Sequence, residues 1–328
     1  MAEIRSACRK WWVWGLVAGS AASLLAGWAA INMRPSLEMW PELPTARQGG
    51  VEVRFFGTAS LAFIDDAEAF VIDGFVSRPR LGPVLLTRLA PDERALRQTF
   101  SQAGVNKVSA VLATHSHYDH AMDASAIVRL YGGEVWGGAS TGRIARADGD
   151  VPFRQIADPD VLEVGAMTVR IFEIDHAPDG LMMGDVAEDF AVPAKAGDYR
   201  FGKGYGLHIT HGECRIMVMP SAGLPHQDLS HYPADVIFLS VGQLGLQDTD
   251  YIRRYYAATV GASGARLVVP IHWDDFTRPL EKPLKPLPYA VDRIDLALTE
   301  ISALAGGGVS VALPVLNAPL DLSASGRC

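Results

Sequence analysis

Cysteine is scarce in this sequence of 328 residues, which contains only Cys8, Cys214 and Cys328. No two of them form a Cys-x-x-Cys pair, so neither a zinc ribbon nor a thioredoxin-like redox motif is supported. A disulfide between Cys214 and Cys328 is possible, but the sequence does not set the distance between them.

Two further features are missing, and each absence argues against a class of function. A phosphate-binding Gly-x-x-x-x-Gly-Lys-Ser/Thr loop does not occur. Long basic runs are also absent, and the formal net charge is −8. Affinity for nucleic-acid phosphates is therefore disfavoured, and we expect no nucleic-acid partner.

The N-terminal stretch Trp11–Ile31 carries no charge and follows Arg5, Arg9 and Lys10. Such a stretch is long enough to span a bilayer, and the basic flank favours a cytoplasmic N-terminus. A cleaved signal peptide is the alternative, because small residues flank Trp28. We expect residues 1–33 to anchor the chain in the inner membrane facing the periplasm, or to leave it periplasmic if they are cleaved.

The rest of the chain is predicted to form a proline-rich linker over 34–50 and one globular domain over 51–328. Apolar runs and alternating patterns predict strands, and apolar residues at helical spacing predict helices. Strands are expected at 51–56, 61–64, 69–72, 108–113, 134–136, 161–164, 167–174, 205–210, 215–219, 236–241, 266–271 and 309–313, and helices at about 91–103, 121–131, 250–260 and 289–304. Two runs of strands, each followed by helices, predict packed sheets covered by helices.

The motif His115-Ser116-His117-Tyr118-Asp119-His120 places three imidazoles and a carboxylate within six residues. An apolar run typical of a buried strand leads directly into it, so the side chains are delivered to one point. Imidazole nitrogens and carboxylate oxygens are ligands for zinc and related divalent metals. The motif therefore predicts a metal site.

Two more histidines follow predicted strands in the same way. His176 comes after the strand expected at 167–174, and His272 comes after the one expected at 266–271. Taken alone, each is more typical of a hydrogen-bonded structural histidine. The repeated arrangement, an apolar strand followed by a histidine, makes both candidates for the same metal centre.

At this point the sequence resembles the metallo-β-lactamase-fold hydrolases over roughly Val51 to Leu313. The resemblance rests on five stretches of the sequence: Thr-His-Ser-His-Tyr-Asp-His at 114–120, Asp175-His176, Pro270-Ile271-His272-Trp273, Phe56-Gly57-Thr58-Ala59-Ser60 and Ile72-Asp73-Gly74. Within the superfamily the chain is most similar to the branch of ascorbate-phosphate lactonase and N-acyl-phosphatidylethanolamine-hydrolysing phospholipase D. The resemblance implies a four-layer αββα sandwich with metals at one edge.

The resemblance also implies roles for individual residues. One metal would be held by His115, His117 and His176, and a second by Asp119, His120 and His272. The implied cofactor is zinc, one or two ions, with manganese or iron as alternatives. Asp73 matches a buried aspartate that steadies the ligand loop without binding metal.

One position departs from the family pattern. The aspartate that normally bridges the two metals is expected after the strand at 215–219, and Ser221 stands there instead. A neutral hydroxyl is a poorer ligand and supplies no charge to hold two cations close together. Three alternatives follow. The site works with one metal or with two metals bridged by hydroxide alone, or another carboxylate (Asp175, Asp185 or Asp228) takes the place of the aspartate. In the third alternative, catalysis has been lost.

The function expected from these features is metal-dependent hydrolysis of an ester, lactone or phosphodiester bond. Activated water would be the nucleophile, and Asp119 would orient or deprotonate it. The expected substrate is a small molecule or lipid-like compound, because Leu181, Met182 and Met183 make an irregular loop apolar. The alternative is a non-catalytic metal- or ligand-binding protein, or a membrane-tethered scaffold, of the same fold. Of the remaining histidines, His226 is the one expected to approach the site, because it follows Ser221 by five positions.

Overall fold

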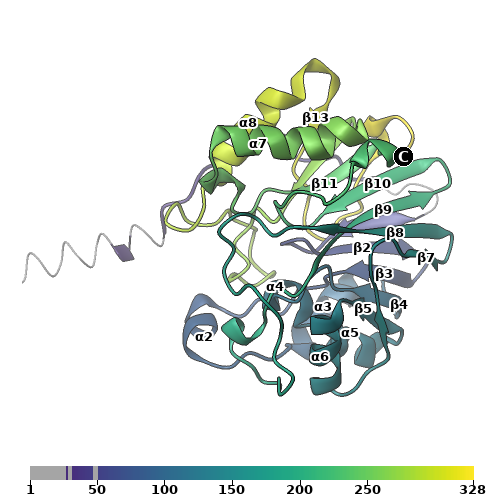
Figure 1. Cartoon of the computed structure of the whole chain (residues 1–328), viewed down its shortest axis with the longest axis vertical. Coiled ribbons are helices and arrows are strands. Elements are labelled where there is room, and N and C mark those ends of the chain that lie inside the picture. The colour runs from purple at the N-terminus through teal and green to yellow at the C-terminus, as the bar shows by residue number, and fades with distance from the viewer. Residues whose placement is uncertain (1–26, 29–31, 47–50) are drawn as a thin grey trace, which may run out of the picture.

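The computed structural model describes residues 27–28, 32–46 and 51–328 of the chain. Two mixed sheets face each other in the middle, and helices cover both outer faces (Figure 1). The expected membrane anchor lies almost wholly outside the described residues. Among the residues that are described, no helix is long and apolar enough to cross a membrane.

The first sheet has six strands, which neighbour one another in sequence order. They are β1 (Glu52–Phe55), β2 (Leu61–Asp65), β3 (Glu68–Ile72), β4 (Lys107–Leu112), β5 (Glu134–Gly137) and β6 (Phe153–Gln155). The first three pair antiparallel through tight turns, and β3 to β6 pair parallel. Parallel neighbours need a crossover, and helices supply it between these strands.

The second sheet has seven strands in the order β13-β12-β11-β10-β9-β8-β7. They are β7 (Val161–Val164), β8 (Met167–Ile174), β9 (Gly204–His211), β10 (Cys214–Met219), β11 (Val236–Ser240), β12 (Leu267–Ile271) and β13 (Ser310–Val311). Pairing is antiparallel from β7 to β10 and parallel from β10 to β13. Every strand expected from the sequence is present.

Helices α3 (Glu93–Gln102), α5 (Ala124–Tyr131) and α6 (Ala139–Ala147) cover the first sheet, and α7 (Thr249–Tyr256) and α8 (Ile294–Ala305) cover the second. Two shorter helices, α2 (Leu81–Leu86) and α4 (Tyr118–Ala121), follow β3 and β4 at the carboxyl ends of these strands.

Three apolar layers hold this arrangement together. Phe70, Trp136 and Phe238 belong to the layer between the two sheets. Phe100 of α3 packs on the outer face of the first sheet, and Leu298 of α8 packs on the outer face of the second. Each sheet is therefore covered on both sides, as the pattern of strands and helices predicts.

The expected helix at 121–131 is present but begins earlier and is broken in two. It starts at Tyr118, so that Asp119 and His120 lie on its first turn, and it is interrupted at Met122 and Asp123. The buried carboxylate of Asp123 accepts hydrogen bonds from the backbone N–H groups of residues 76 and 77. This contact ties the start of α5 to the loop that follows β3.

Several elements were not expected from the sequence. Helices α2 and α6 and strand β6 lack a clear apolar period, and α8 begins at Ile294 instead of near Tyr289. The turn before α8 is held by Asp292, whose carboxylate accepts hydrogen bonds from the N–H groups of Gln243 and Arg293. Tertiary contacts of this kind decide where a helix starts, and a sequence pattern does not report them.

The proline-rich segment expected to be a linker is packed against the domain where it is described. Trp40 and Leu43 are buried, and the N–H of Leu43 donates to the carbonyl of Leu313 at 2.7 Å. Arg34 forms an ion pair with Asp275 at 2.7 Å. Residues 34–46 are therefore part of the folded body.

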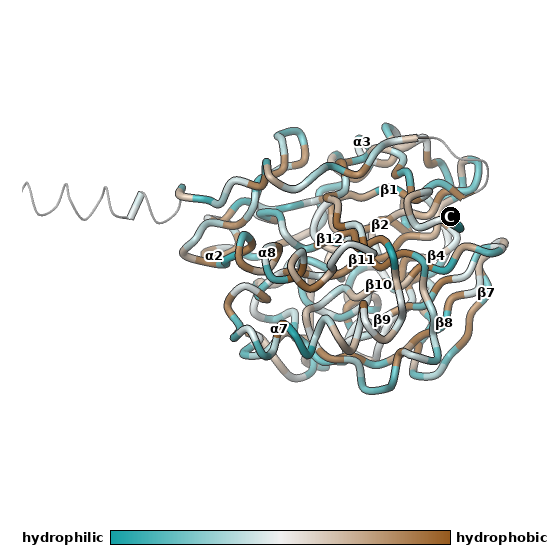
Figure 2. The backbone as a smooth tube through the Cα atoms, turned by 90° about the horizontal axis from the view of Figure 1, so that it is seen from above, coloured by the Kyte–Doolittle hydropathy of each residue, from teal (hydrophilic) through white to brown (hydrophobic). Residues whose placement is uncertain are grey.

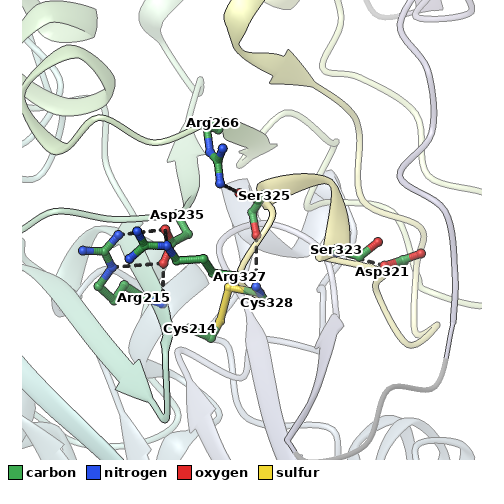
Figure 3. Close-up of a disulfide and its surroundings, with 9 residues drawn as sticks. All are labelled: Cys214, Arg215, Asp235, Arg266, Asp321, Ser323, Ser325, Arg327 and Cys328. Atoms are coloured by element: carbon green, nitrogen blue, oxygen red, sulfur yellow. Dashed lines mark hydrogen bonds and ion pairs between the residues drawn. A yellow bond between two sulfur atoms is a disulfide. The ribbon is translucent and has the colours of Figure 1, made fainter.

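The C-terminal segment is tied to the second sheet by a disulfide between Cys214 and Cys328 (Figure 3). Their Cα atoms lie 4.7 Å apart, so the pairing that the sequence left open is formed. Close by, Arg215 of β10 donates three hydrogen bonds to the carboxylate of Asp235, two from its guanidinium and one from its backbone N–H. Both contacts lie at the start of β10, at the opposite end of that strand from Ser221.

Candidate metal centre

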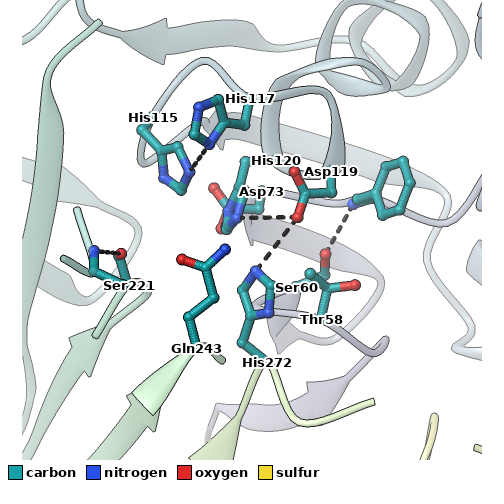
Figure 4. Close-up of polar contacts among 12 residues, drawn as sticks. Thr58, Ser60, Asp73, His115, His117, Asp119, His120, Ser221, Gln243 and His272 are labelled. Atoms are coloured by element: carbon teal, nitrogen blue, oxygen red, sulfur yellow. Dashed lines mark hydrogen bonds and ion pairs between the residues drawn. The ribbon is translucent and has the colours of Figure 1, made fainter. Parts of the chain in front are cut away.

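The histidine motif begins in the loop after β4, at the carboxyl end of a buried strand, and ends in the first turn of α4. Asp73, which follows β3, holds this loop: it accepts hydrogen bonds from the N–H of Thr114 at 2.8 Å and from its hydroxyl at 3.1 Å. The second oxygen of Asp73 also lies 2.7 Å from Nδ1 of His120. Asp73 therefore fixes both the loop and the ring of His120 on α4 (Figure 4).

The structure brings the six candidate ligands together as two groups of three. His115, His117 and His176 form one group, and in it the potential ligand atoms all lie within 4.8 Å of one another. Nε2 of His115 lies 3.2 Å from Nδ1 of His117. His176 arrives from the end of β8, in the other sheet, so the group spans both sheets.

Asp119, His120 and His272 form the second group, again with ligand atoms within 4.8 Å. Oδ2 of Asp119 lies 3.3 Å from Nε2 of His272 and 3.6 Å from Nε2 of His120. The rings of His115 and His120 are 3.8 Å apart between centroids, so the two groups adjoin. Three strands, β4, β8 and β12, therefore deliver all six side chains to one place.

His272 has a left-handed backbone, with φ of +58°. Its N–H donates to the carbonyl of Thr58 at 2.5 Å, and the N–H of Thr58 donates to Asp274 at 2.7 Å. Asp274 also forms a buried ion pair with Arg78. A positive φ is strained for a residue with a side chain, and here these contacts hold it.

Burial and neighbouring charges set the protonation of the site. Burial lowers the pKa of His115 well below its ordinary value, lowers that of His117 to about 4, and lowers that of His176. The first group is thus neutral at neutral pH.

In the second group, neighbouring charges favour the charged forms of His120 and Asp119. Burial opposes the charged form of His120, but the carboxylates of Asp73 and Asp119 outweigh it and raise the pKa of this ring. Burial would also raise the pKa of Asp119, yet His120 and His272 hold it below the usual range. Asp119 is therefore ionised at neutral pH.

This donor set fits a divalent cation. Neutral imidazoles present free lone pairs, and the ionised carboxylate of Asp119 supplies negative charge to the second group. Three protein ligands in each group leave coordination positions open to solvent or substrate. The fit is the one typical of zinc and similar metals that accept nitrogen and oxygen donors.

Ser221 lies just after β10 and lines the same cavity, but its hydroxyl is engaged elsewhere. It accepts a hydrogen bond from the N–H of Ala177 at 3.1 Å. The three carboxylates considered as substitutes are engaged away from the metal groups: Asp175 contacts His226, Asp185 accepts from Ser140, and Asp228 accepts from Ser230. None of them is among the residues that line the cavity.

The expectation that His226 approaches the site is wrong. Its ring is about half exposed and lies 2.9 Å from Oδ1 of Asp175, on the outside of the loop. It is not among the residues lining the cavity. Its nearness to Ser221 along the chain does not set the direction in which its side chain points.

A stretch with the pattern Gly-x-Ser-x-Gly lies at 138–142, where Gly138 caps α6 and the other four residues begin that helix, and such a pattern is typical of the nucleophile in serine hydrolases. The structure gives Ser140 a different role. Its hydroxyl donates to Asp185 at 3.0 Å and accepts from the N–H of Val186 at 3.1 Å, and no histidine is among these partners. Ser140 is buried and does not line the cavity. It therefore holds the loop near Asp185 in place and is not a nucleophile.

Two residues of the site were not found from the sequence. Phe201 places its ring 5.1 Å to 5.8 Å from those of His115, His117 and His176, so it backs the first group. Gln243, just after β11, lines the cavity and has a left-handed backbone with φ of +64°. Figure 4 shows its amide turned toward the histidines. Neither residue belongs to a recognisable sequence motif. The positive φ of Gln243 could not be predicted either, because the sequence does not indicate which residues other than glycine adopt a left-handed backbone.

The two groups open into a cavity of about 430 Å³. Its polar wall is formed by the ligands together with Ser221, Gln243 and Asp292. Its remaining wall is mostly apolar, with Val84, Leu85, Leu181, Phe276, Leu287 and Val291. A cavity of this size with a few convergent polar groups is typical of a small-molecule site.

Comparison with known proteins agrees with this geometry. The sequence family described as the Beta-lactamase superfamily domain matches residues 70–273. A UPF0173 protein of Pyrococcus furiosus is 27% identical over 119 residues, which cover 36% of this chain and 56% of that protein. The match thus spans little more than half of the relative's length.

Among solved structures, a possible metal-dependent hydrolase from Veillonella parvula superposes with a TM-score of 0.50 at 16% identity, covering 81% of this chain and 95% of that one. A variant of CmlA β-hydroxylase gives 0.50 at 15% identity, covering 82% of this chain and 53% of that one. Identities this low show a shared fold alone. With the family match over most of the domain and both metal-ligand groups in place, the chain belongs to the metallo-β-lactamase superfamily.

Proposed function

We propose that this protein is a metal-dependent hydrolase of ester, lactone or phosphodiester bonds. The observation that carries the proposal is the pair of adjoining ligand groups, His115/His117/His176 and Asp119/His120/His272, at the polar end of one cavity. We propose zinc as the cofactor, one or two ions, with manganese or iron as alternatives. When bound, such a cation lowers the pKa of water and polarises the oxygen of the scissile bond.

The protein's own groups then have distinct tasks. Asp119 stays ionised because its pKa is held low, so it is a weak base and a good hydrogen-bond acceptor. Its task is to orient the attacking water toward the substrate. Asp73 keeps the ring of His120 in place through the 2.7 Å contact at Nδ1, which leaves Nε2 facing the site.

The apolar wall of the cavity supports a substrate with an apolar portion. Leu85, Leu181 and Val291 would contact that portion while the scissile bond lies at the ligand groups. Small esters and lactones as well as lipid-like compounds meet this description. The substrate class proposed is therefore a small or lipid-like molecule with one hydrolysable polar group.

We also propose that residues 1–33 anchor the chain in a membrane, with the folded domain exported. The support is the uncharged stretch Trp11–Ile31 in the sequence. The disulfide Cys214–Cys328 adds support, because disulfides persist in oxidising compartments and are rare in the cytosol.

Metal analysis combined with an activity panel tests the main proposal. The purified chain is analysed for bound metal and assayed with a bis-aryl phosphodiester, aryl esters and a set of lactones. We expect at least one equivalent of metal and turnover of one class, both lost in His117→Ala. His231→Ala, which changes an exposed histidine outside the cavity, is the matched control and keeps both. A chain that takes up no metal when supplied with zinc, manganese or iron contradicts the proposal.

A second candidate function is metal or ligand binding without hydrolysis, either by itself or as part of a membrane-tethered scaffold. Ser221 favours it, since the position expected to hold a bridging carboxylate carries a hydroxyl already bound to Ala177. Under this alternative, metal is bound but no substrate in the panel is turned over. If the role is that of a membrane-tethered scaffold, Asp119→Ala leaves it intact in a complementation assay, whereas the same change abolishes the role of a hydrolase.

A further inference from the structure

Helix α2 is apolar and yet has no buried residue. Its sequence is Leu-Gly-Pro-Val-Leu-Leu, and Leu85 and Leu86 are 70% and 84% exposed. Leu81, one turn earlier, is exposed as well. Clustered leucines on one short surface helix are unusual for a protein surrounded by water and mark an interaction site.

More exposed apolar residues lie at the mouth of the same cavity. Leu181 is 70% exposed, and Val291 is also exposed. Both line the cavity together with Leu85, so they stand around one opening. We call Leu81, Leu85, Leu86, Leu181 and Val291 the mouth face.

Cations stand beside the mouth face. A second cavity, of about 440 Å³, shares Val84, Phe276 and Val291 with the first, and its lining includes Arg80 and Lys282. Both cations are exposed, and no ion pair is formed by either within the part of the chain that the structure describes. Positive charge here contrasts with the net charge of −8 for the whole chain.

The N-terminal segment meets the domain on this side. Asn32 and Arg34 line the second cavity together with Leu81. The N–H of Tyr289 donates to the carbonyl of Met33 at 3.0 Å, two residues from Val291 of the mouth face. The uncharged stretch Trp11–Ile31 immediately precedes this point in the sequence.

We propose that the mouth face docks on a lipid bilayer that contains anionic lipids. The leucines of α2 enter the interface, where their apolar surface leaves water, and Arg80 and Lys282 lie against the headgroups. The cavity then opens toward the membrane. A substrate could then enter the cavity from the bilayer by its apolar part. Only this entry of substrate, and not the docking itself, rests on the proposed function.

A bilayer fits these observations better than a second copy of the chain or a soluble partner. Unpaired cations beside leucines suit an interface with apolar chains below anionic headgroups. The uncharged stretch ends, in the sequence, just before the residues that reach this side. An anchor formed by that stretch would hold the mouth face close to the lipid.

Site-directed fluorescence tests the docking without any turnover. The full chain, carrying Cys8→Ser so that no other free cysteine remains, receives Leu85→Cys and an environment-sensitive dye at that position. It is reconstituted into vesicles of phosphatidylcholine and phosphatidylglycerol with quenchers on the lipid chains. The control carries the dye at Val161→Cys, an exposed apolar position on β7, which lies across the domain from α2 in Figures 1 and 2.

We expect the dye at position 85 to shift to the blue and to be quenched at least several-fold more than the dye at position 161. Replacing phosphatidylglycerol by phosphatidylcholine should reduce the quenching, as should Arg80→Glu with Lys282→Glu. Equal quenching at positions 85 and 161 overturns the proposal.

A blue shift at position 85 that appears without vesicles and grows with protein concentration also overturns it, in favour of a second copy. Because α2 has no buried residue, the labelled variants are expected to remain folded, and thermal melting checks this.

Discussion

Ser221 carries the largest difference between this site and the family pattern, and it can be tested by restoring the missing charge. The side chain lies at the cavity wall, and Asp175, Asp185 and Asp228 are engaged elsewhere. The sequence predicted both the position and the lack of a carboxylate there. It left open whether another acid compensates, because that depends on the direction of side chains on loops.

Ser221→Asp should increase affinity for a second cation, by about tenfold or more, since it adds a charged oxygen to the wall of the cavity that both groups share. Its oxygen can still accept the hydrogen bond from Ala177. Calorimetric titration of metal-free protein with zinc measures the change. Ser221→Asn has the same shape without the charge and serves as control; equal affinities for the two variants would show that charge at this position is unimportant.

Gln243 has a left-handed backbone, which is energetically unfavourable for a residue with a side chain. The hydrogen bond from its N–H to the carboxylate of Asp292, at 2.6 Å, keeps the backbone in this conformation. Such strain is typical of positions kept for function. Gln243→Gly should therefore be more stable than Gln243→Ala by about 1 kcal/mol, because glycine adopts this φ freely.

Urea unfolding of the two variants measures that difference. If the amide also contacts substrate, both variants lose turnover to a similar extent although their stabilities differ. Equal stability of the two variants would mean that the left-handed backbone is not present in solution.

At the scale of single elements, the loop from Ala113 to His117 is the most informative. Its apolar strand, its ligands and its metal-binding character were all predicted, because a buried run followed by clustered donors leaves little choice. The start of the helix at Tyr118 was not predicted, and neither was the packing of Phe201 against the rings. Phe201 reaches these rings from a segment far along the chain, with its ring centroid 5.2 Å from that of His115, and no local pattern reports such a contact.

The neutral histidines of this loop predict a dependence of stability on pH. In the folded chain the pKa of His117 is about 4, whereas an unfolded histidine has a pKa of about 6.5. The folded state therefore resists protonation, and the stability that this residue contributes above pH 6.5 is lost as the pH falls toward 4. For metal-free protein the loss from His117 is about 3 kcal/mol.

Urea unfolding of metal-free protein across this range measures the loss. His117→Gln removes the titrating group, so its stability should fall less steeply with acid than that of the unchanged chain. Parallel curves for the two proteins would contradict the assignment of a low pKa to His117.

At the scale of the whole molecule, the two sheets and their covering helices follow from the alternation of strands and helices in the sequence. How the ends of the domain are secured is not visible there. Residues 34–46 pack on the body, and the C-terminal segment runs beside them and beside β1: Leu316 pairs with Phe55, and Leu320 with Thr45. These contacts join segments far apart in the chain, for which no local pattern exists.

The disulfide should contribute strongly to global stability. Cys214 and Cys328 are 114 residues apart. In the chain-entropy account, closing a loop of this length lowers the conformational entropy of the unfolded chain and so stabilises the folded state by roughly 4–5 kcal/mol. Cys328→Ser should lower the free energy of unfolding by an amount of that order. Urea unfolding of the variant, and of the unchanged chain with and without reductant, gives the measurement. An unchanged unfolding midpoint under reduction would contradict the prediction.

The same covalent link changes how the molecule responds to proteolysis. A single cut anywhere between residues 214 and 328 yields two fragments that remain one molecule, since the sulfur–sulfur bond bypasses the break. His272, which lies inside that loop, then stays attached to the fragment that carries the other five ligands. A nicked protein would run as one band on a denaturing gel until a reductant separates the pieces.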